Sequence, residues 1–169
     1  MITYLNGDAT EPKVDGPKII AHVCNNIGAW GRGFVLSLSL RYPLAERAYR
    51  GWYQQNIDHN RIDPPFKLGE VQFVQIGDVY IANMIGQHGI FPVEGVSPVR
   101  YDAIEACLNI VSVAAKNRNA SVHMPRIGCG LAGGKWSDVE PILARTLKDL
   151  DVYVYDFETQ DARTISWNR

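Results

Sequence analysis

The residues best suited to chemistry form a glycine-rich stretch from Met124 to Trp136. Four of the seven residues from 128 to 134 are glycines. Because glycine has no Cβ and tolerates positive φ, successive backbone N–H groups in such a loop can surround an anion, most simply a phosphate. The stretch matches neither the dinucleotide-binding fingerprint nor the phosphate loop of nucleoside triphosphatases. The alternative interpretation is therefore a tight strand-to-helix turn with incidental glycines.

A second loop of the same kind strengthens the phosphate interpretation. Residues 25–33, Asn-Asn-Ile-Gly-Ala-Trp-Gly-Arg-Gly, follow an apolar run from Lys18 to Cys24 that is typical of a strand buried on both faces. A third loop, residues 85–91, also follows a predicted strand. In open α/β folds ligands bind beyond the carboxyl ends of the strands, so we expect the three loops to converge at one crevice. Two phosphate-binding loops indicate a diphosphate, and therefore a nucleotide or a nucleotide sugar.

The elements that must position these loops alternate between strand and helix patterns. Strands are predicted over residues 2–5, 18–24, 71–76, 79–84, 121–124 and 152–157, and helices over residues 34–41, 44–55, 101–117 and 139–150. We expect the last helix to have its N-cap at Ser137 or Asp138. Residues 85–98 are predicted to form a long loop, and loops of this length are frequently functional. The alternation predicts an α/β fold, a three-layer α/β/α sandwich around a mixed, mostly parallel sheet.

Length and composition are those of an ordinary globular domain. The chain has 169 residues, 46% hydrophobic and 21% charged, and its net charge of −1 gives no overall electrostatic reason to bind nucleic acid or a membrane. Its three cysteines are widely spaced and no metal-binding spacing occurs, so we expect reduced thiols, no metal site and no cofactor. The first residues lack a signal-peptide pattern, and no apolar run reaches membrane-spanning length. We therefore expect a cytoplasmic, monomeric protein without membrane association.

Three motifs, in this order along the chain, resemble the macrodomain, an ADP-ribose-binding fold. They are residues 7–10 (Gly-Asp-Ala-Thr), residues 20–25 leading into the loop at 28–33, and residues 124–131 (Met-Pro-Arg-Ile-Gly-Cys-Gly-Leu). The resemblance covers residues 2–157, so we expect residues 1–157 to form a macrodomain and residues 158–169 a polar tail. The third motif is similar to the terminal ADP-ribose protein glycohydrolase branch. Residues 28–49 are also similar to the ADP-ribose-1″-phosphate phosphatase branch.

The resemblance implies a set of ligand contacts. It places Asp8 at the adenine amino group, where an Asx-turn residue is the alternative, and Asn25 at the distal ribose. It also implies that the two glycine loops grip the distal ribose and the diphosphate. An aromatic at the end of the last strand is implied beside the adenine, with core packing as the alternative. His22 matches a histidine of the phosphatase branch but lies in an apolar strand, where a core role is the alternative. The residues expected to contact the ligand are Asp8, Ala9, His22, Asn25, Asn26, Gly28, Trp30, Gly31, Gly33, Arg126, Gly128, Cys129, Gly130, Leu131, Ala132, Gly133, Tyr155 and Phe157.

Catalysis depends on groups that can act at C1″ of the distal ribose. Glycohydrolysis there passes through an oxocarbenium-like state that needs an acid, an activated water or a covalent nucleophile. The glycohydrolase branch uses a lysine nucleophile and an aspartate in the glycine loop. This chain has Ala132 at the aspartate position and no lysine between Lys67 and Lys116, so we expect no covalent lysine mechanism. The predicted catalytic residues are instead Gln87, Asn25 and His88. Gln87 would position a water, and His88 would be a general acid or base, although a lone loop histidine is commonly only a surface residue.

Two functions of different class follow from the resemblance. The first is a hydrolase that removes mono-ADP-ribose from modified acceptors through a positioned water. We expect the acceptor to be an ester on a protein carboxylate rather than a nucleic acid, because a carboxylate leaves readily. The second is a non-catalytic ADP-ribose reader, which the missing lysine and aspartate favour. A third alternative, phosphatase action on ADP-ribose 1″-phosphate, uses the same ligand and breaks a different bond.

Overall fold

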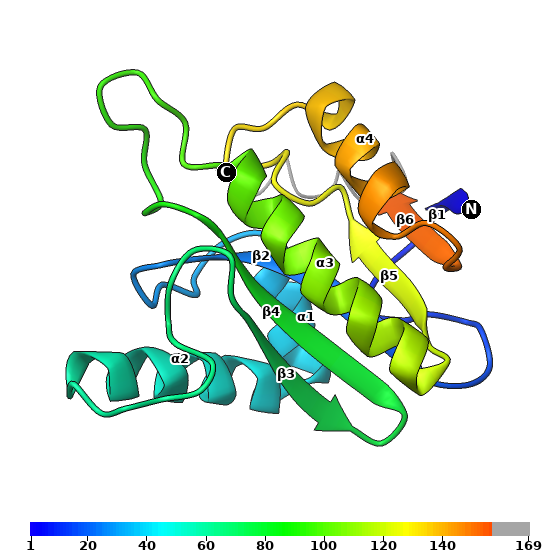
Figure 1. The fold of residues 1–169 in the computed structure, drawn as a ribbon, viewed down its shortest axis with the longest axis horizontal. Coiled ribbons are helices and arrows are strands. Elements are labelled where there is room, and N and C mark those ends of the chain that lie inside the picture. The colour runs from blue at the N-terminus through cyan, green and yellow to red at the C-terminus, as the bar shows by residue number, and fades with distance from the viewer. Residues whose placement is uncertain (157–169) are drawn as a thin grey trace.

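The structure, a computed structural model, describes residues 1–156, which contain a six-stranded sheet in the order β1-β6-β5-β2-β4-β3 (Figure 1). The strands are β1 (Ile2–Asn6), β2 (Lys18–Asn25), β3 (Val71–Ile76), β4 (Val79–Gln87), β5 (Ser121–Pro125) and β6 (Val152–Asp156). β3 runs antiparallel to β4, and the other neighbouring strands run parallel. The prediction of a mixed, mostly parallel sheet is confirmed. Phe157 and the predicted tail lie outside the described residues.

Helices cover both faces of the sheet. The helices are α1 (Phe34–Arg41), α2 (Pro43–Ile57), α3 (Tyr101–Arg118) and α4 (Trp136–Thr146). Successive residues of a strand face opposite sides, so β2 gives Ile19 and Ala21 to the core under α3 and α4, and Ile20 and Cys24 to the core under α1 and α2. The continuous apolar run is therefore buried on both faces, and the three-layer α/β/α sandwich is confirmed (Figure 1).

The strand order places the three predicted site loops next to one another. β2 lies between β5 and β4, and all three strands run in the same direction. Their carboxyl ends therefore lie at the same edge of the sheet, which we call the carboxyl edge. The loops that begin at residues 26, 88 and 126 leave the sheet from adjacent strands there. No helix among residues 1–156 has the length and apolarity needed to cross a membrane.

The predicted long loop, residues 85–98, is confirmed from residue 88 onward, because no named strand or helix lies between Gln87 and Tyr101. β4 continues through Gln87, which pairs with Asn25 of β2 after a shift in register. Beyond it, residues 88–98 form a projecting hairpin that we call the arm. His88 N donates to Pro98 O (2.8 Å), and Gln87 forms an isolated bridge with Val99. The prediction ended β4 three residues early because glycine and glutamine at positions 86 and 87 interrupt the apolar pattern.

The last helix is also displaced from its predicted bounds. α4 begins at Trp136 with Lys135 as N-cap, rather than after Ser137 or Asp138, and it ends at Thr146 instead of Leu150. The N-cap position lies against α3, because Lys135 N donates to the Tyr101 hydroxyl (3.2 Å). Past the helix, Asp149 has φ of 69°, a value incompatible with continued right-handed helix.

Candidate functional site

The first glycine loop, residues 25–33, is held from within by Asn25, whose side chain is 7% exposed. Its Oδ1 accepts hydrogen bonds from Ile27 N and Ala29 N, both at 3.0 Å, and the single proton of the Tyr49 hydroxyl is shared between Oδ1 (2.9 Å) and Asn25 O (2.7 Å). Its Nδ2 donates to Ala29 O (2.7 Å). The two backbone N–H donors fill both lone pairs of the amide oxygen, while Nδ2 keeps a second N–H for another acceptor. Asn25 therefore orders the loop, and its predicted contact with the distal ribose and its predicted catalytic role stay predictions.

Trp30 and His22 belong to the core beneath this loop and not to its surface. Trp30 is 4% exposed, donates from Nε1 to Ser39 Oγ (2.7 Å) and packs against Tyr49. His22 is 2% exposed and packs against Trp30, with ring centroids 5.3 Å apart. His22 Nε2 donates to Asn83 Oδ1 (2.5 Å), since Asn83 Nδ2 donates to other groups. Burial lowers the pKa of His22 to about 4. Both are core side chains, which is the alternative given for His22, and their predicted ligand contacts stay predictions.

The second glycine loop, residues 126–134, is closed by its own backbone. Gly134 N donates to Gly128 O (2.7 Å), and Gly133 N donates to Gly130 O (3.1 Å). φ is 72° at Gly128 and 79° at Gly133, a region that favours glycine. A Cβ at Gly134 would lie 2.4 Å from Gly128 O. The fold itself therefore explains three of the four glycines of this loop, all but Gly130.

Gly130 and Gly31, one from each loop, are not required by the fold. Neither has φ in the left-handed region, and a Cβ at either position would meet nothing within 4 Å. The two loops touch beside them, because a Cβ on Gly33 would lie 3.7 Å from Cδ1 of Leu131, a residue that is 62% exposed. Each loop thus presents unobstructed backbone next to the point where the loops meet.

Arg126, at the start of the second loop, is engaged by its neighbours. It forms a bidentate ion pair with Asp156, with Nε–Oδ1 at 2.6 Å and a second contact to Oδ2 at 2.9 Å. Its guanidinium carbon lies 5.2 Å from the ring centroids of both Tyr4 and Trp136. The hydrogen bond from Arg126 lowers the pKa of Asp156. Arg126 therefore links β5, β6 and α4, and a contact with diphosphate would have to displace this arrangement.

Cys129 and Ala132 of the second loop differ in their exposure to a ligand. Cys129 is half-buried, its Sγ donates to Ile127 O (3.4 Å), and burial raises the pKa of the thiol. Ala132 is 5% exposed, and its carbonyl accepts Val99 N (3.0 Å). The position at which the resemblance implies a catalytic aspartate is therefore part of the core in this chain.

Among the residues predicted to lie near the adenine, Asp8 keeps a carboxylate oxygen available, whereas Ala9 and Tyr155 are buried. Asp8 Oδ1 accepts both Thr10 N and Thr10 Oγ1 at 2.8 Å, the Asx-turn arrangement. Its Oδ2 has no partner among residues 1–156, so the prediction that it accepts an adenine amino group stays open. Ala9 is buried, at 2% exposed. Tyr155 is 8% exposed and its hydroxyl bonds to His123 Nδ1 (2.8 Å), which is the core-packing alternative.

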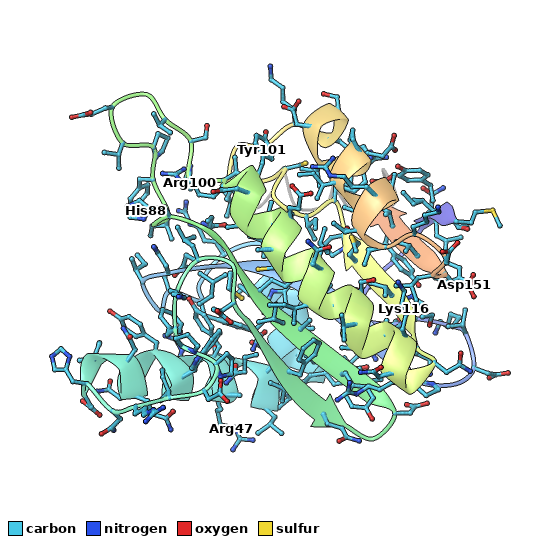
Figure 2. All side chains as sticks on the ribbon, viewed as in Figure 1. Arg47, His88, Arg100, Tyr101, Lys116 and Asp151 are labelled. Carbon is cyan, nitrogen blue, oxygen red and sulfur yellow. The ribbon has the colours of Figure 1, made fainter. Side chains whose placement is uncertain are left out.

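Asn26, Gln87 and His88 come together beyond β2 and β4. Asn26 Oδ1 accepts Gly89 N (2.9 Å), which leaves Asn26 Nδ2 to donate to His88 Nδ1 (3.0 Å). Neutral His88 therefore carries its proton on Nε2. Gln87 Nε2 donates to Gly89 O (2.9 Å), and within the described residues its Oε1 has no partner. His88 is exposed at the base of the arm (Figure 2). Adjacent residues thus offer a free N–H donor and a free carbonyl acceptor at the carboxyl edge.

A cavity of about 420 Å³ lies away from these loops, at the opposite edge of the sheet. It is lined by Ser121 at the start of β5, Lys116 and Asn119 at the end of α3, and Asp149 and Asp151, among others. None of the predicted site residues lines it. Among residues 1–156, no group of three or more His, Cys, Asp or Glu side chains could hold a metal ion.

No protein-family model matches the chain. A macrodomain protein of known structure from Streptomyces coelicolor is 50% identical to it, covers 92% of this chain and 99% of its own, and has a TM-score of 0.79. The chain belongs to the macrodomain family. The loops at its carboxyl edge are therefore those of a macrodomain, and the predicted family is confirmed.

Relatives of this macrodomain include hydrolases. The ADP-ribose 1″-phosphate phosphatase of Lodderomyces elongisporus is 26% identical over 166 residues, which are 92% of this chain and 99% of that protein. The DNA ADP-ribosyl glycohydrolase of Mycobacterium tuberculosis is 28% identical over 163 residues, 92% of this chain but 42% of that protein. The chain spans only 18% and 15% of the chromodomain-helicase-DNA-binding protein 1-like proteins of Mus musculus and Danio rerio, at 27% and 28% identity. This macrodomain is thus related to ADP-ribose hydrolases.

Side chains of α2 hold the first glycine loop of this macrodomain, and none of them was predicted from the sequence. The buried Tyr49 hydroxyl donates to Asn25 O (2.7 Å), and Arg50 donates to Gly28 O (3.4 Å) and Trp30 O (3.2 Å). The Tyr53 ring occupies the space in front of Gly28, where a Cβ would lie 2.2 Å from it. Helical periodicity shows which face of α2 is buried, but it carries no signal for which distant loop carbonyls the polar groups meet.

Proposed function

We propose that this macrodomain binds ADP-ribose across the two glycine loops. The observation that carries the proposal is Gly130. Its φ, its exposure and its surroundings would all accept a side chain, so the fold gives no reason for a glycine there. A ligand that approaches the backbone closely gives such a reason, because N–H groups can then reach phosphate oxygens without obstruction. Gly31 supports the same placement from the first loop.

The proposed reaction is removal of mono-ADP-ribose from an ester on a protein carboxylate. Gln87 Oε1 accepts a hydrogen bond from a water molecule and orients it toward C1″ of the distal ribose. The water oxygen forms the new bond to C1″, the bond from C1″ to the ester oxygen breaks, and its electron pair leaves with the carboxylate. His88 donates its Nε2 hydrogen bond to the departing oxygen, which stabilises the developing charge. The water proton passes to the substrate diphosphate or to solvent. Asn26 supports this step by fixing the tautomer of His88.

This proposal needs neither a lysine nucleophile nor an aspartate in the glycine loop. A carboxylate is a good leaving group, so a positioned water and a hydrogen-bond donor are enough for an ester. The hydrolases among its relatives, a phosphatase and a DNA glycohydrolase, support the reaction class rather than the acceptor. The second candidate is a non-catalytic ADP-ribose reader. The burial of Ala132 favours it, because that position offers no polar group to a reaction.

The test is a time course of the purified protein with a carboxylate-linked mono-ADP-ribosylated protein, beside a calorimetric titration with ADP-ribose. We expect free ADP-ribose to be released. Gln87→Ala should lower kcat by about tenfold or more while it changes the ADP-ribose Kd by less than about threefold, because the side chain acts on the water and not on the ligand.

Binding without release would leave the reader, and ADP-ribose 1″-phosphate would then be tested as substrate. An equal loss of kcat and of affinity in Gln87→Ala would make this side chain a ligand contact instead. Val113→Ser, at an exposed position in the second half of α3, is the matched control for expression and folding.

A further inference from the structure

The arm, residues 88–98, has a defined shape and an apolar tip. Val93 and Val96 exchange two backbone hydrogen bonds, Val93 N to Val96 O at 3.0 Å and Val96 N to Val93 O at 2.9 Å. Between them φ is 51° at Glu94 and 76° at Gly95, the signs required at the two central residues of a type I′ hairpin turn. The tip is therefore a closed two-residue turn, and Figure 1 shows the green segment projecting from the body of the molecule.

The base of the arm is fixed to both glycine loops. Asn26 of the first loop bonds to His88 and to Gly89 N. On the other side, Val99 N donates to Ala132 O of the second loop (3.0 Å), and Ser97 lies against Gly133. The arm therefore rises directly from the proposed site of hydrolysis, and a group joined to the distal ribose has to pass beside it.

The tip exposes apolar side chains that the fold does not use. Phe91 is 69% exposed, Val93 59% and Val96 56%. All three side chains face solvent. Exposed apolar residues that gather on one projecting element are typical of a contact surface rather than of an ordinary solvent-facing loop.

The charge of the arm distinguishes between the two classes of acceptor. From Gly86 to Val99 the only Asp, Glu, Lys or Arg is Glu94, at the tip. Nucleic-acid binding depends on lysine and arginine side chains that contact the phosphates. The carboxylate of Glu94 at the tip would instead repel the phosphates. Arg100, the next cation, donates from one guanidinium nitrogen to the carbonyls of residues 97, 98 and 99. A polypeptide with apolar side chains near the modified residue matches this surface.

We propose that the tip of the arm, formed by Phe91, Val93 and Val96, binds the polypeptide that surrounds the ADP-ribosylated side chain. This inference rests on the proposed function, because it names the surface that contacts the protein acceptor of that same site. Free ADP-ribose would be held by the glycine loops alone. The arm would contribute only when the ligand is joined to a protein.

The experiment compares the double variant Phe91→Ser, Val96→Ser with the parent protein and with Val113→Ser, an equally exposed valine on α3. Three probes are used: free ADP-ribose, a carboxylate-linked mono-ADP-ribosylated protein, and an ADP-ribosylated single-stranded oligonucleotide. ADP-ribose affinity is measured by calorimetry. For the two modified acceptors kcat/KM is measured, or Kd where no turnover occurs. Thermal melting verifies that each variant folds.

We expect the double variant to lower kcat/KM, or affinity, for the modified protein by about tenfold or more, since exposed aromatic anchors dominate such contacts. The ADP-ribose Kd should stay within about twofold of the parent, because the tip lies outside the glycine loops. Equal values for the modified protein in the parent and the double variant would overturn the inference while leaving the proposed function intact. A loss confined to the oligonucleotide would also overturn it, because the tip would then stack on bases. A parent protein that binds none of the three probes would overturn both.

Discussion

Residues 25–33 and 126–134 both follow a strand near the centre of the sheet, both are rich in glycine, and the two loops touch. The first loop turns its characteristic side chains inward, so that Asn25 and Trp30 hold it to the core. The second is closed by its own backbone hydrogen bonds and leaves Gly130 and Leu131 exposed. The difference shows that glycine-rich loops of similar composition can have different roles. In one loop buried side chains fix the backbone, and in the other the exposed backbone itself is available to a ligand.

Because the first loop is held by buried side chains, we expect substitutions of these side chains to lower the stability of the protein. We expect Trp30→Ala to lower the free energy of unfolding by about 3–5 kcal/mol, the usual cost of removing a large buried aromatic. The ring is 4% exposed and packs against Tyr49 and His22, so the variant leaves a cavity. Denaturant unfolding followed by circular dichroism is the measurement.

Trp30→Phe is the matched control, since it keeps an aromatic ring and loses mainly the hydrogen bond to Ser39, which is worth about 1 kcal/mol. A stable Trp30→Ala protein with no affinity for ADP-ribose would break the comparison. It would mean that the ring contacts the ligand and that the first loop opens in solution.

A substitution at the exposed backbone of the second loop should instead lower the affinity for ADP-ribose and leave stability unchanged. Gly130→Glu places a bulky negative charge where the proposed diphosphate lies, and we expect ADP-ribose affinity to fall by about 100-fold or more, or about 3 kcal/mol. The melting temperature should not change, because a Cβ at this position meets nothing within 4 Å. Calorimetry and thermal melting are the two measurements.

Gly130→Gln separates charge from bulk at the same position and should bind more tightly than Gly130→Glu. Gly28→Ala is the contrasting variant from the first loop. Its Cβ would lie 2.2 Å from the Tyr53 ring at a φ of 75°, so we expect it to lose stability. Unchanged affinity in Gly130→Glu would contradict the placement of the diphosphate.

The fold could be predicted from local patterns because its strongest signals are local. The apolar run of β2 and the alternation of strands and helices identify the sandwich, and the order of the glycine loops identifies the family. The inward turn of Asn25 could not be predicted from loop composition, because part of its support is the Tyr49 hydroxyl, which lies 24 residues further along the chain. Loop composition shows which residues are near a site, but a distant helix determines which of them face it.

The arm was missed for a different physical reason. Type I′ turns are recognised from Asn-Gly or Asp-Gly, because these residues tolerate positive φ at both central positions. Here the pair is Glu94-Gly95, and glutamate at a φ of 51° is uncommon. The valines on either side read as part of a glycine- and proline-containing loop. Only the backbone geometry reveals that they pair.

The comparison extends into the strands below the loops, since each strand has a buried histidine. His22 of β2 contacts Trp30 of the first loop, and His123 lies in β5, which leads to the second loop. Burial lowers the pKa of both to about 4 from an ordinary value of 6.5. The unfolded chain therefore binds more protons than the native protein between these values. Stability that is present above pH 6.5 is lost as the pH falls toward 4, by roughly 2 kcal/mol per histidine at pH 5.

Denaturant unfolding at pH 7.5 and pH 5 measures this loss. His22→Gln should reduce the difference between the two pH values by roughly 2 kcal/mol, because one of the two titrating groups is gone. It should also lower stability at pH 7.5, since the contact with Trp30 is weakened, and comparison of the two pH values removes that constant offset. His59→Gln, at an exposed position after α2, is the matched control. If His22→Gln kept the full pH dependence, protonation of His22 would not be what lowers the stability of the protein in acid. The buried neutral histidine would then contribute nothing to holding Trp30 and the first loop against β2.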